Sequence, residues 1–529
     1  MSGPTGFVSI VGAGPGSPDL ITLAARDRLE RADVVIADYL ANPALLLWCR
    51  PDAIILQRRR GPRSEQPLPE GLLPLRQSAV NEAIVAHARQ GRSVVRLKGG
   101  DPCMFGRGAE EAAVLAEAGI AYELIPGVSS PIAAPQAAGI PVTHRDFTPA
   151  VTFVSGFEAY DKAGLHVAWE HLARSAGTIV VMMSVGNARD NAAKLVAAGR
   201  SSDTPAAMVR WGTRGIQRTV VGTLADIGDK IEQAGIRAPA VLVVGEVVSL
   251  RQQLAWIETR PLFGRRIAVT RSIRQGAPLR RLLGEHGADV VPIPCLAVEP
   301  PADITGLHDA LGRVATDFDG MILTSPNGVH ATFDALAGAG LDVRTFAGKT
   351  IAVIGEATAR ACKARGVVPD VVPTAPRSEG LVAALSGRLN QRWLLPRADE
   401  ARDVLPKAVV AAGGSCELVV AYRAVRPTVP YLLVQSVLPA NEGGEGLDVV
   451  CFASGKTARH WLETLTETLG ADATQTVLAA AKVVSLGPVT TAALESMSIV
   501  VDATAAEPTD AAMVAAVRAV CADGSRAPT

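Results

Sequence analysis

The chain has 529 residues, 48% hydrophobic and 20% charged, which suits several packed domains and excludes global disorder. The chain has 52 Lys plus Arg and 52 Asp plus Glu. It therefore lacks the excess positive charge that would indicate nucleic acid or an anionic membrane as a partner. The seven cysteines include no C-x-x-C pair and the eight histidines show no ligand spacing, so no disulfide framework and no metal site are expected.

The chain alternates β-branched strands with Ala- and Leu-rich helices, the pattern of an α/β protein with mainly parallel sheets. Buried strands are predicted at residues 7–11, 34–36, 94–97, 178–182 and 241–244, and helices at 20–31 and 110–118. Residues 58–74, rich in Arg, Pro and Gly, predict a surface loop, and the loss of periodicity at 248–266 predicts a linker. No apolar run reaches the ~18 residues of a membrane span and no signal peptide is visible, so a cytoplasmic protein is expected.

Glycine-rich turns follow three predicted strands of the first half. The first, Gly12-Ala-Gly14-Pro-Gly16, has the spacing G-x-G-x-G, which leaves a nicotinamide site and a plain tight turn equally open. The other two turns are residues 98–102 (KGGDP) and 126–131 (PGVSSP). Asp101 of the former can accept hydrogen bonds, and the serines of the latter place hydroxyl groups at the start of a predicted helix. Turns at the ends of parallel strands share one rim of a sheet, where α/β proteins bind ligands.

These motifs resemble a known family. Residues 11–17 (VGAGPGS), 95–108 (VRLKGGDPCMFGRG) and 139–146 (GIPVTHRD) are similar to uroporphyrinogen-III C-methyltransferases, members of the tetrapyrrole methylases. The resemblance spans about residues 5–258 and implies a two-lobed fold, S-adenosylmethionine as cofactor, and a homodimer formed through this half. It also implies cofactor contacts at Pro15, Gly99, Gly100, Asp101, Met104, Ser129, Ser130, Met183 and Gly212.

Methyl transfer needs the nucleophilic ring carbon held in line with the donor, and then a base that removes a proton. The resemblance assigns that carboxylate to Asp38, whereas the residue by itself, without the family, favours a capping or turn aspartate. Asp38 lies in ADYL where the family has Tyr-Asp-Arg-Leu, and Arg58 aligns with the family lysine proposed as proton donor. An arginine binds carboxylates but scarcely deprotonates, so these departures fall on the substrate side of the site.

The second half contains an internal duplication. Three strand-end motifs, around Arg271, Ser325 and Gly355, recur in the same order about 130 residues later, a period far longer than that of solenoid repeats. The sequence therefore predicts two similar α/β lobes with a ligand cleft between them. Backbone N–H groups and hydroxyls at the starts of the helices would bind a polyanion there.

This half resembles uroporphyrinogen-III synthase. Residues 267–271 (IAVTR), 323–327 (LTSPN), 353–358 (VIGEAT), 394–397 (LLPR), 420–423 (VAYR) and 486–490 (LGPVT) follow its pattern. The resemblance implies that the first strand and the last third of this half share a lobe, and that Tyr422 assists loss of a hydroxyl from hydroxymethylbilane. The predicted substrate contacts are Arg271, Thr324, Ser325, Asn327, Thr358, Arg397, Ser454 and Thr490, and either arginine could instead pair with a surface acid.

The two resemblances together predict a bifunctional enzyme, because uroporphyrinogen III is the product of one activity and the substrate of the other. The expected division is 1–250 for the methylase, 251–263 for a linker and 264–529 for the synthase. Tetrapyrroles are the expected partners, and the product precorrin-2 leads to sirohaem or cobalamin. Two alternatives stay open: a methylase half that only binds the cofactor, and one that methylates a different precorrin.

Overall fold

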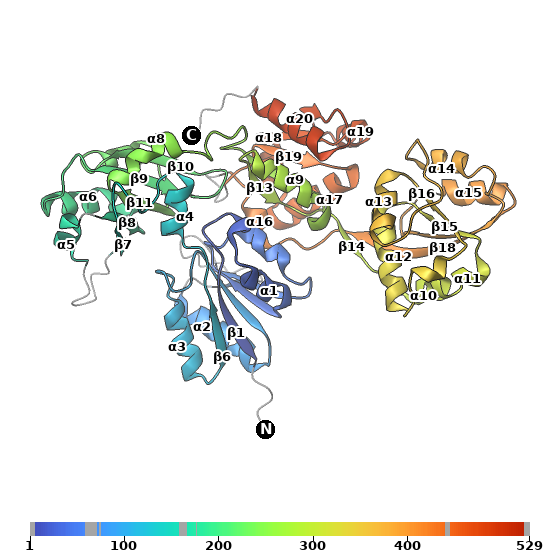
Figure 1. The fold of residues 1–529 in the computed structure, drawn as a ribbon, viewed down its shortest axis with the longest axis horizontal. Coiled ribbons are helices and arrows are strands. Elements are labelled where there is room, and N and C mark those ends of the chain that lie inside the picture. The colour runs from blue at the N-terminus through green and yellow to red at the C-terminus, as the bar shows by residue number, and fades with distance from the viewer. Residues whose placement is uncertain are drawn as a thin grey trace. The chain divides into compact units, whose positions relative to one another are not determined.

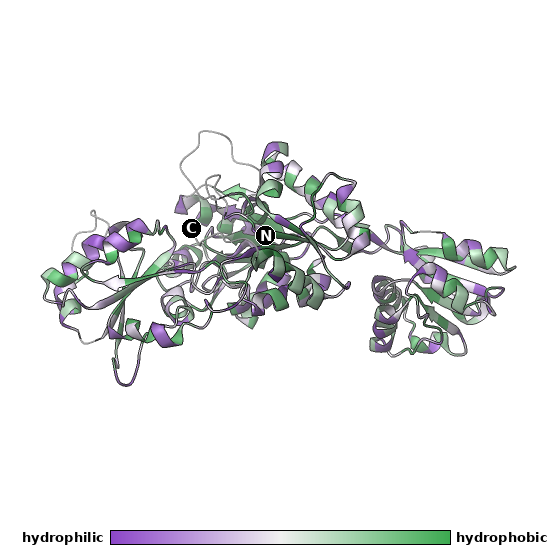
Figure 2. Ribbon diagram, turned by 90° about the horizontal axis from the view of Figure 1, so that it is seen from above, coloured by the Kyte–Doolittle hydropathy of each residue, from purple (hydrophilic) through white to green (hydrophobic). Residues whose placement is uncertain are grey.

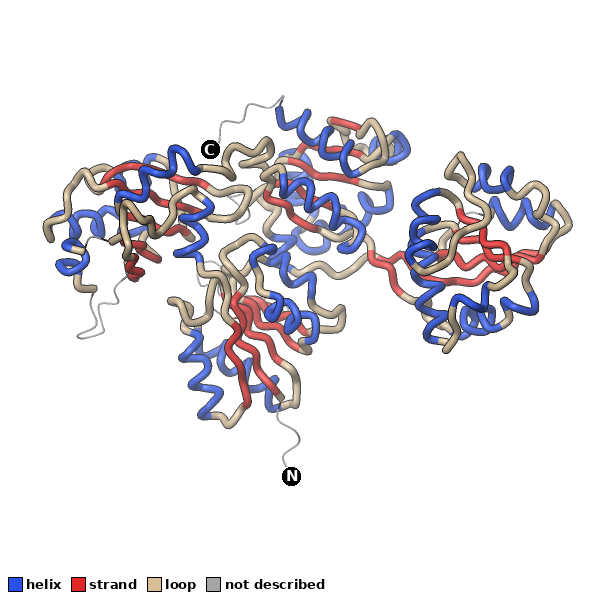
Figure 3. Tube along the Cα trace, in the orientation of Figure 1, coloured by secondary structure: helices blue, strands red, loops and turns tan. Residues whose placement is uncertain are grey.

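The computed structural model describes residues 6–58, 71–73, 76–157, 167–175, 177–401, 403–439 and 445–522. The chain forms two compact units, Met1–Cys295 with Thr428–Thr529, and Leu296–Pro427. Figure 1 traces the elements along the chain, and Figure 3 shows helices on both sides of the strands within each lobe. No helix in the described part of the chain is long and apolar enough to cross a bilayer.

The first sheet is entirely parallel, with the order β4-β3-β2-β5-β1-β6. Alternate residues of β1 face opposite sides, so Ile10 packs with α2 and α3 while Val11 packs with α1 and η2. The strands are β1 (Phe7–Gly12), β2 (Val34–Ala37), β3 (Ile54–Arg58), β4 (Leu72–Leu73), β5 (Val94–Lys98) and β6 (Ala121–Ile125). The helices are η1 (Pro18–Leu20), α1 (Leu23–Arg31), η2 (Pro43–Trp48), α2 (Gln77–Arg89) and α3 (Gly108–Glu117).

The second sheet has the order β10-β9-β11-β8-β7, in which only β7 and β8 run parallel. Helix α4 follows the last strand of the first sheet but packs on the second through Ala134 and Ala138. The strands are β7 (Val151–Ser155), β8 (Thr178–Met182), β9 (Pro205–Arg210), β10 (Arg218–Thr223) and β11 (Ala240–Val244). The helices are α4 (Ser130–Ala137), α5 (Trp169–Arg174), η3 (Val185–Asn187), α6 (Ala188–Ala197), α7 (Ile227–Gln233), η4 (Glu246–Leu250) and α8 (Arg251–Leu254).

The third sheet, with the order β13-β12-β19-β20-β21, joins the first strands of the second half to its last third. All its pairs are parallel, and Trp461 packs edge-on against Phe452 in the core. The strands are β12 (Arg266–Val269), β13 (Asp289–Pro292), β19 (Val449–Phe452), β20 (Lys482–Ser485) and β21 (Ala503–Thr504). The helices are α9 (Ile273–Glu285), α16 (Tyr431–Gln435), α17 (Gly455–Leu469), α18 (Ala471–Ala480), α19 (Pro488–Glu495) and α20 (Asp510–Ala522).

The fourth sheet forms the second unit by itself, with the order β14-β18-β17-β15-β16 and β14 antiparallel to its neighbour. Figure 2 shows hydrophobic strands between helices whose outer faces are more hydrophilic. The strands are β14 (Ala297–Glu299), β15 (Gly320–Leu323), β16 (Thr350–Val353), β17 (Arg392–Ala398) and β18 (Ser415–Val425). The helices are α10 (Thr305–Gly312), α11 (Val314–Asp317), α12 (Pro326–Gly338), η5 (Val343–Phe346), α13 (Glu356–Ala364), α14 (Ser378–Ala384) and α15 (Val404–Ala411).

The predicted α/β class and the duplication are confirmed, and matched backbone angles show the duplication directly. Ser325 and Ser454 cap α12 and α17 with φ/ψ of −162°/155° and −164°/161°. Gly355 and Gly487 precede α13 and α19 with 168°/−179° and 173°/175°. Equivalent turns therefore begin equivalent helices in the third and fourth sheets.

Two local predictions differ from the structure. The first helix begins at Leu23, because the Thr22 side chain accepts a hydrogen bond from the Ala25 amide and caps it there. The predicted loop at 58–74 contains β4, paired with β3, while residues 59–70 and 74–75 lie outside the described part. The predicted linker, residues 251–263, starts with α8, and its Ile257 and Leu262 are buried. Apolar packing therefore holds this segment in place, although its sequence shows no helix or strand periodicity.

Candidate functional site

The three glycine turns of the first sheet meet at the carboxyl ends of β1, β5 and β6. The amide of Gly14 donates to the carbonyl of Gly100 at 3.2 Å, and that of Gly100 donates back at 2.8 Å. A Cβ on Gly12 would lie 2.6 Å from the Cα of Gly127, and one on Gly127 would lie 2.3 Å from the carbonyl oxygen of Gly100. No side chain fits between these turns, so the glycines let three loops form one continuous rim.

Asp101 ties two of these turns together. Its carboxylate accepts hydrogen bonds from the amides of Cys103 at 2.8 Å and Gly127 at 3.1 Å. Gly99 is closely packed, since a Cβ there would lie 2.8 Å from the Cβ of Leu40, whereas one on Gly100 would meet only ordinary contacts beginning at 3.8 Å. The rim is therefore rigid at Gly99 and open at Gly100, where a flat ligand can approach the backbone.

The second sheet supplies the facing side of this rim. Ser129 precedes α4, and a Cβ added to Gly212 would lie 2.3 Å from the Cβ of Ala134 on that helix. The amide of Ser17 donates to Thr213 Oγ1 at 3.1 Å, which joins the first glycine turn to the loop after β9. The structure thus brings together the predicted cofactor turns around Pro15, Gly99–Asp101, Ser129–Ser130 and Gly212. Met104 is partly exposed beside the Asp101 turn, and Met183, with a φ of 56°, is 52% exposed after β8.

Asp38 follows β2 and lies at the edge of a buried ionic network. Its amide donates to the carbonyl of Leu97 at 2.8 Å, and its Oδ2 lies 3.3 Å from Nη2 of Arg96. Oε1 of Glu111, on α3, contacts Nε of Arg96 at 3.2 Å and Nζ of Lys98 at 3.0 Å. The side chains of Arg96, Lys98 and Glu111 are at most 4% exposed, whereas that of Asp38 is 14% exposed. One carboxylate of a buried, charge-balanced network therefore reaches the surface.

Burial, followed by the charge of Arg96, lowers the pKa of Lys98, and Glu111 opposes the shift. Arg96, Lys98 and Glu111 are not among the site residues predicted from the sequence. The available signal was a pair of cations two residues apart in an otherwise apolar strand, which places both on one buried face. Arg58, the other predicted catalytic residue of this half, is the last residue of β3, and its side chain lies outside the described part of the structure.

In the second unit, the structure brings two of the predicted synthase residues together. Ser325 Oγ lies 2.9 Å from the phenolic oxygen of Tyr422 and accepts a hydrogen bond from the amide of Gly328 at 2.9 Å. Tyr422 is 9% exposed. Thr324 and Asn327 flank Ser325 in the same turn, whereas Thr358 is only 1% exposed.

The equivalent turns of the third sheet lie in the other unit. Ser454 accepts from the amide of Thr457 in a capping box, and Thr490, 7% exposed, donates to the carbonyl of Ala453 at 3.2 Å. Arg271 forms an ion pair with Asp510.

The corresponding arginine of the second unit, Arg397, lies 2.7 Å from Asp403. Both predicted arginines thus pair with nearby acids, the alternative that the sequence had left open.

Comparison with known proteins gives two family matches on consecutive parts of the chain. A model described as "Tetrapyrrole (Corrin/Porphyrin) Methylases" matches residues 8–228, and one described as "Uroporphyrinogen-III synthase HemD" matches residues 277–515. A uroporphyrinogen-III C-methyltransferase of Bacillus subtilis is 38% identical over 352 residues, which are 66% of this chain and 70% of the relative.

Two further relatives cover different lengths. The porphyrin biosynthesis protein HemD of Ruminiclostridium josui is 34% identical over 386 residues, 73% of this chain and 75% of its own. An S-adenosyl-L-methionine-dependent uroporphyrinogen III methyltransferase of Methanosarcina barkeri is 44% identical over 256 residues, 48% of this chain and 96% of its own. The alignments with the Bacillus subtilis and Ruminiclostridium josui relatives are too long to lie within the methylase region alone.

Proposed function

We propose, from the premise that this chain is an enzyme belonging to both the tetrapyrrole methylase and the uroporphyrinogen-III synthase families, that it catalyses two consecutive steps of tetrapyrrole synthesis. The synthase half closes hydroxymethylbilane to uroporphyrinogen III with inversion of the last ring. The methylase half then transfers two methyl groups to that product and gives precorrin-2. The observation that carries the proposal is the presence, in one chain, of two families that share one intermediate.

S-adenosylmethionine is the methyl donor, and its sulfonium makes the methyl group electrophilic. The residues around the glycine rim fit this molecule: the backbone at Gly100 is open to a flat group, and the Ser129–Ser130 turn offers hydroxyls and the amides of a helix start. Asp101 holds two turns together, so its carboxylate fixes the shape of the rim even before it contacts a ligand. Met104 and Met183 provide apolar, polarisable walls.

Asp38 is the proton acceptor for the methylase half. A proton must leave the tetrapyrrole after each methyl transfer, and a carboxylate near the surface accepts it within hydrogen-bond reach. Arg96 contacts Oδ2 of Asp38 and also donates to the carbonyls of Ile36 and Leu97, so the guanidinium is fixed to two strands. The carboxylate is thereby held in one orientation, as a general base requires.

Tyr422 assists loss of the hydroxyl in the synthase half, with Ser325 as its partner. When Ser325 donates its proton to the phenolic oxygen, the O–H of Tyr422 is free to point at the leaving group. The Gly328 amide donates to Ser325 and fixes the serine oxygen at the start of α12. The rest of the rate enhancement of ring closure comes from holding the linear tetrapyrrole in a curled conformation, with backbone amides binding its carboxylates.

The division into residues 1–250, 251–263 and 264–529 is part of the proposal, and so is a homodimer through the methylase half. Light scattering of the purified chain checks the dimer.

The deciding experiment incubates the purified chain with hydroxymethylbilane and S-adenosylmethionine and identifies the products by mass and isomer analysis. Dimethylated type III product is expected. Unmethylated type III product alone would contradict the methylase proposal and would direct attention to Arg58 and Tyr39. The type I isomer alone, which forms spontaneously, would contradict the synthase proposal. The matched controls are Asp38→Asn, which is expected to stop methylation only, and Tyr422→Phe, which is expected to slow ring closure only.

A further inference from the structure

The loop after β9, which carries Gly212, has a strained backbone. Trp211 and Thr213 on either side of Gly212 have φ values of 51° and 75°, a left-handed conformation that side chains rarely adopt. Residues persist in this conformation only where the surroundings hold them, and they cluster at ligand sites. The Gly212 loop, defined here as Trp211 to Arg214, therefore needs an anchor.

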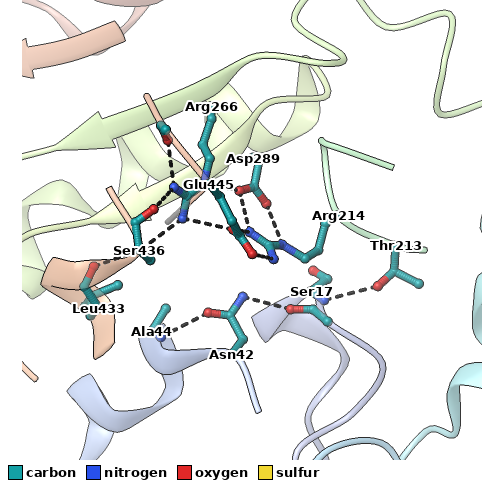
Figure 4. Close-up of polar contacts among 12 residues, drawn as sticks. Ser17, Asn42, Ala44, Thr213, Arg214, Arg266, Asp289, Leu433, Ser436 and Glu445 are labelled. Carbon is teal, nitrogen blue, oxygen red and sulfur yellow. Dashed lines mark hydrogen bonds and ion pairs between the residues drawn. The ribbon is translucent and has the colours of Figure 1, made fainter. Parts of the chain in front are cut away.

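Part of the anchor comes from the methylase half itself. Thr213 accepts from the amide of Ser17, and its own amide donates to Gln217 Oε1 at 3.1 Å. Figure 4 shows the first of these contacts. Beside it, the side chain of Asn42 donates to the carbonyl of Gly16 at 2.8 Å. The Ser17 bond connects the Gly212 loop with the first glycine turn, and the partners of the Arg214 side chain come from elsewhere.

Arg214 is held by two carboxylates from the synthase half. Its Nε and Nη2 donate to Asp289 at 3.0 and 2.8 Å, and its Nη1 and Nη2 donate to Glu445 at 3.1 and 2.6 Å (Figure 4). The guanidinium also lies over the ring of Trp211, with its carbon 4.7 Å from the centroid. The side chains of Arg214 and Asp289 are each 9% exposed, so the pairing is largely desolvated.

Arg266, at the start of β12, completes the cluster and fixes both acids. It contacts Asp289 Oδ2 at 3.0 Å and Glu445 Oε2 at 3.2 Å, which gives two positive and two negative charges. Although burial alone raises the pKa of Asp289 and Glu445, the two guanidinium groups outweigh it and hold both pKa values below their ordinary range.

The backbones meet beside this cluster. A Cβ on Gly215 would lie 2.2 Å from the amide nitrogen of Asp289, and the amide of Gly264 donates to the carbonyl of Gly215 at 2.7 Å. The cluster also borders a cavity of about 340 Å³ that is lined by Gly16 of the first glycine turn and by Tyr39, the neighbour of Asp38. The synthase half therefore contacts the end of the Gly212 loop, beside a cavity that residues of the first glycine turn and of the Asp38 segment also line.

We propose that Asp289 and Glu445 are positioning residues for methyl transfer: through Arg214 they hold the Gly212 loop in the strained shape that binds the methyl donor. The synthase half thus completes the donor site of the methylase half without touching the donor. This inference rests on the proposed function, because it takes Gly212 as part of the donor site.

The test measures binding of S-adenosylhomocysteine to the full chain by calorimetry. Glu445→Gln keeps the shape of the side chain but removes its charge, and we expect the Kd to rise by about 2- to 30-fold, the range by which residues outside a ligand site alter affinity. Asp289→Asn should act in the same direction. The matched control is Asp502→Asn, which breaks an ion pair of the same lobe with Lys482 and should leave the Kd unchanged.

A double-mutant cycle separates positioning from general damage to the fold. If Glu445 acts through Arg214, Glu445→Gln should weaken binding much less when Arg214 is already Lys. Type III ring closure by the same samples should persist. Equal affinity of Glu445→Gln and wild type, or an equal loss in Asp502→Asn, would overturn the inference while leaving the proposed function intact. Failure of the wild type to bind S-adenosylhomocysteine would instead overturn the proposed methylase function, and this inference with it.

Discussion

Glu111→Gln offers a direct test of the buried network behind Asp38. Glu111, with a side chain 1% exposed, contacts both Arg96 and Lys98, so neutralising its carboxylate leaves the two buried cations with Asp38, which contacts Arg96, as the remaining carboxylate of the network. Breaking a buried ion pair by removing one partner costs about 3–5 kcal/mol. Glu110→Gln is the matched control, because its carboxylate is 56% exposed and pairs with exposed Arg107, a contact that contributes about 1 kcal/mol or less.

The loss of stability should depend on pH. Burial and Arg96 already lower the pKa of Lys98, and without Glu111 it falls further. Between that lowered pKa and the ordinary lysine value, the unfolded chain binds more protons than the folded one, so stability rises with pH. The Glu111→Gln penalty should therefore be smaller at pH 9 than at pH 7.

Hydrogen exchange of peptides from β5 and α3, followed in increasing urea, measures this lobe separately from the others. The same penalty at both pH values, or one no larger than that of Glu110→Gln, would refute the reasoning.

Three further predictions concern other parts of the chain. Ser325→Ala and Tyr422→Phe should slow type III ring closure less than additively, with a coupling of about 1 kcal/mol for one hydrogen bond, and initial rates of a double-mutant cycle measure it. Trp461→Ala, which empties a site that is 0% exposed, should destabilise its lobe by about 3–5 kcal/mol in a urea titration, whereas a loss below 1 kcal/mol would contradict the packing. Exposed Cys103 should be alkylated quickly, and S-adenosylhomocysteine should slow that alkylation. Cys451, whose pKa is raised to about 12 by burial, should stay unmodified in mass spectra of the same samples.

The strands and their terminal turns could be predicted from sequence because their signals are local. Short runs rich in apolar residues, each followed by a glycine-rich turn, marked β1 and β5, and the structure extends each predicted strand by a single residue, to Gly12 and Lys98. The α/β class, the duplication and both families follow from such segments and their order. The burial of Ile257 and Leu262 within the predicted linker could not be predicted in this way, because it depends on surfaces formed elsewhere in the chain.

Ionic partners could not be predicted in the same way. Arg271 and Arg397 stand at strand ends, where a free cation would serve a polyanion, yet Asp510 and Asp403 lie beside them. The pairing of Arg271 joins residues 239 positions apart, and no periodicity reports such a distance. The Arg214 cluster escaped prediction for the same reason, because Glu445 lies 231 positions further along the chain.

The discontinuous third sheet has a consequence for the order in which the chain is completed during translation. The amide of Arg266 bonds to Asp448, 182 positions later, so β12 emerges from the ribosome long before β19, which lies beside it. Until then one edge of β12 offers unpaired backbone groups, while the Leu296–Pro427 unit forms in between. Glu445 emerges immediately before β19, so Arg214 of the nascent methylase half lacks one of its two carboxylate partners until synthesis has passed the Leu296–Pro427 unit. The methylase half, although made first, thus reaches its final geometry only when this later part of the synthase half has been made.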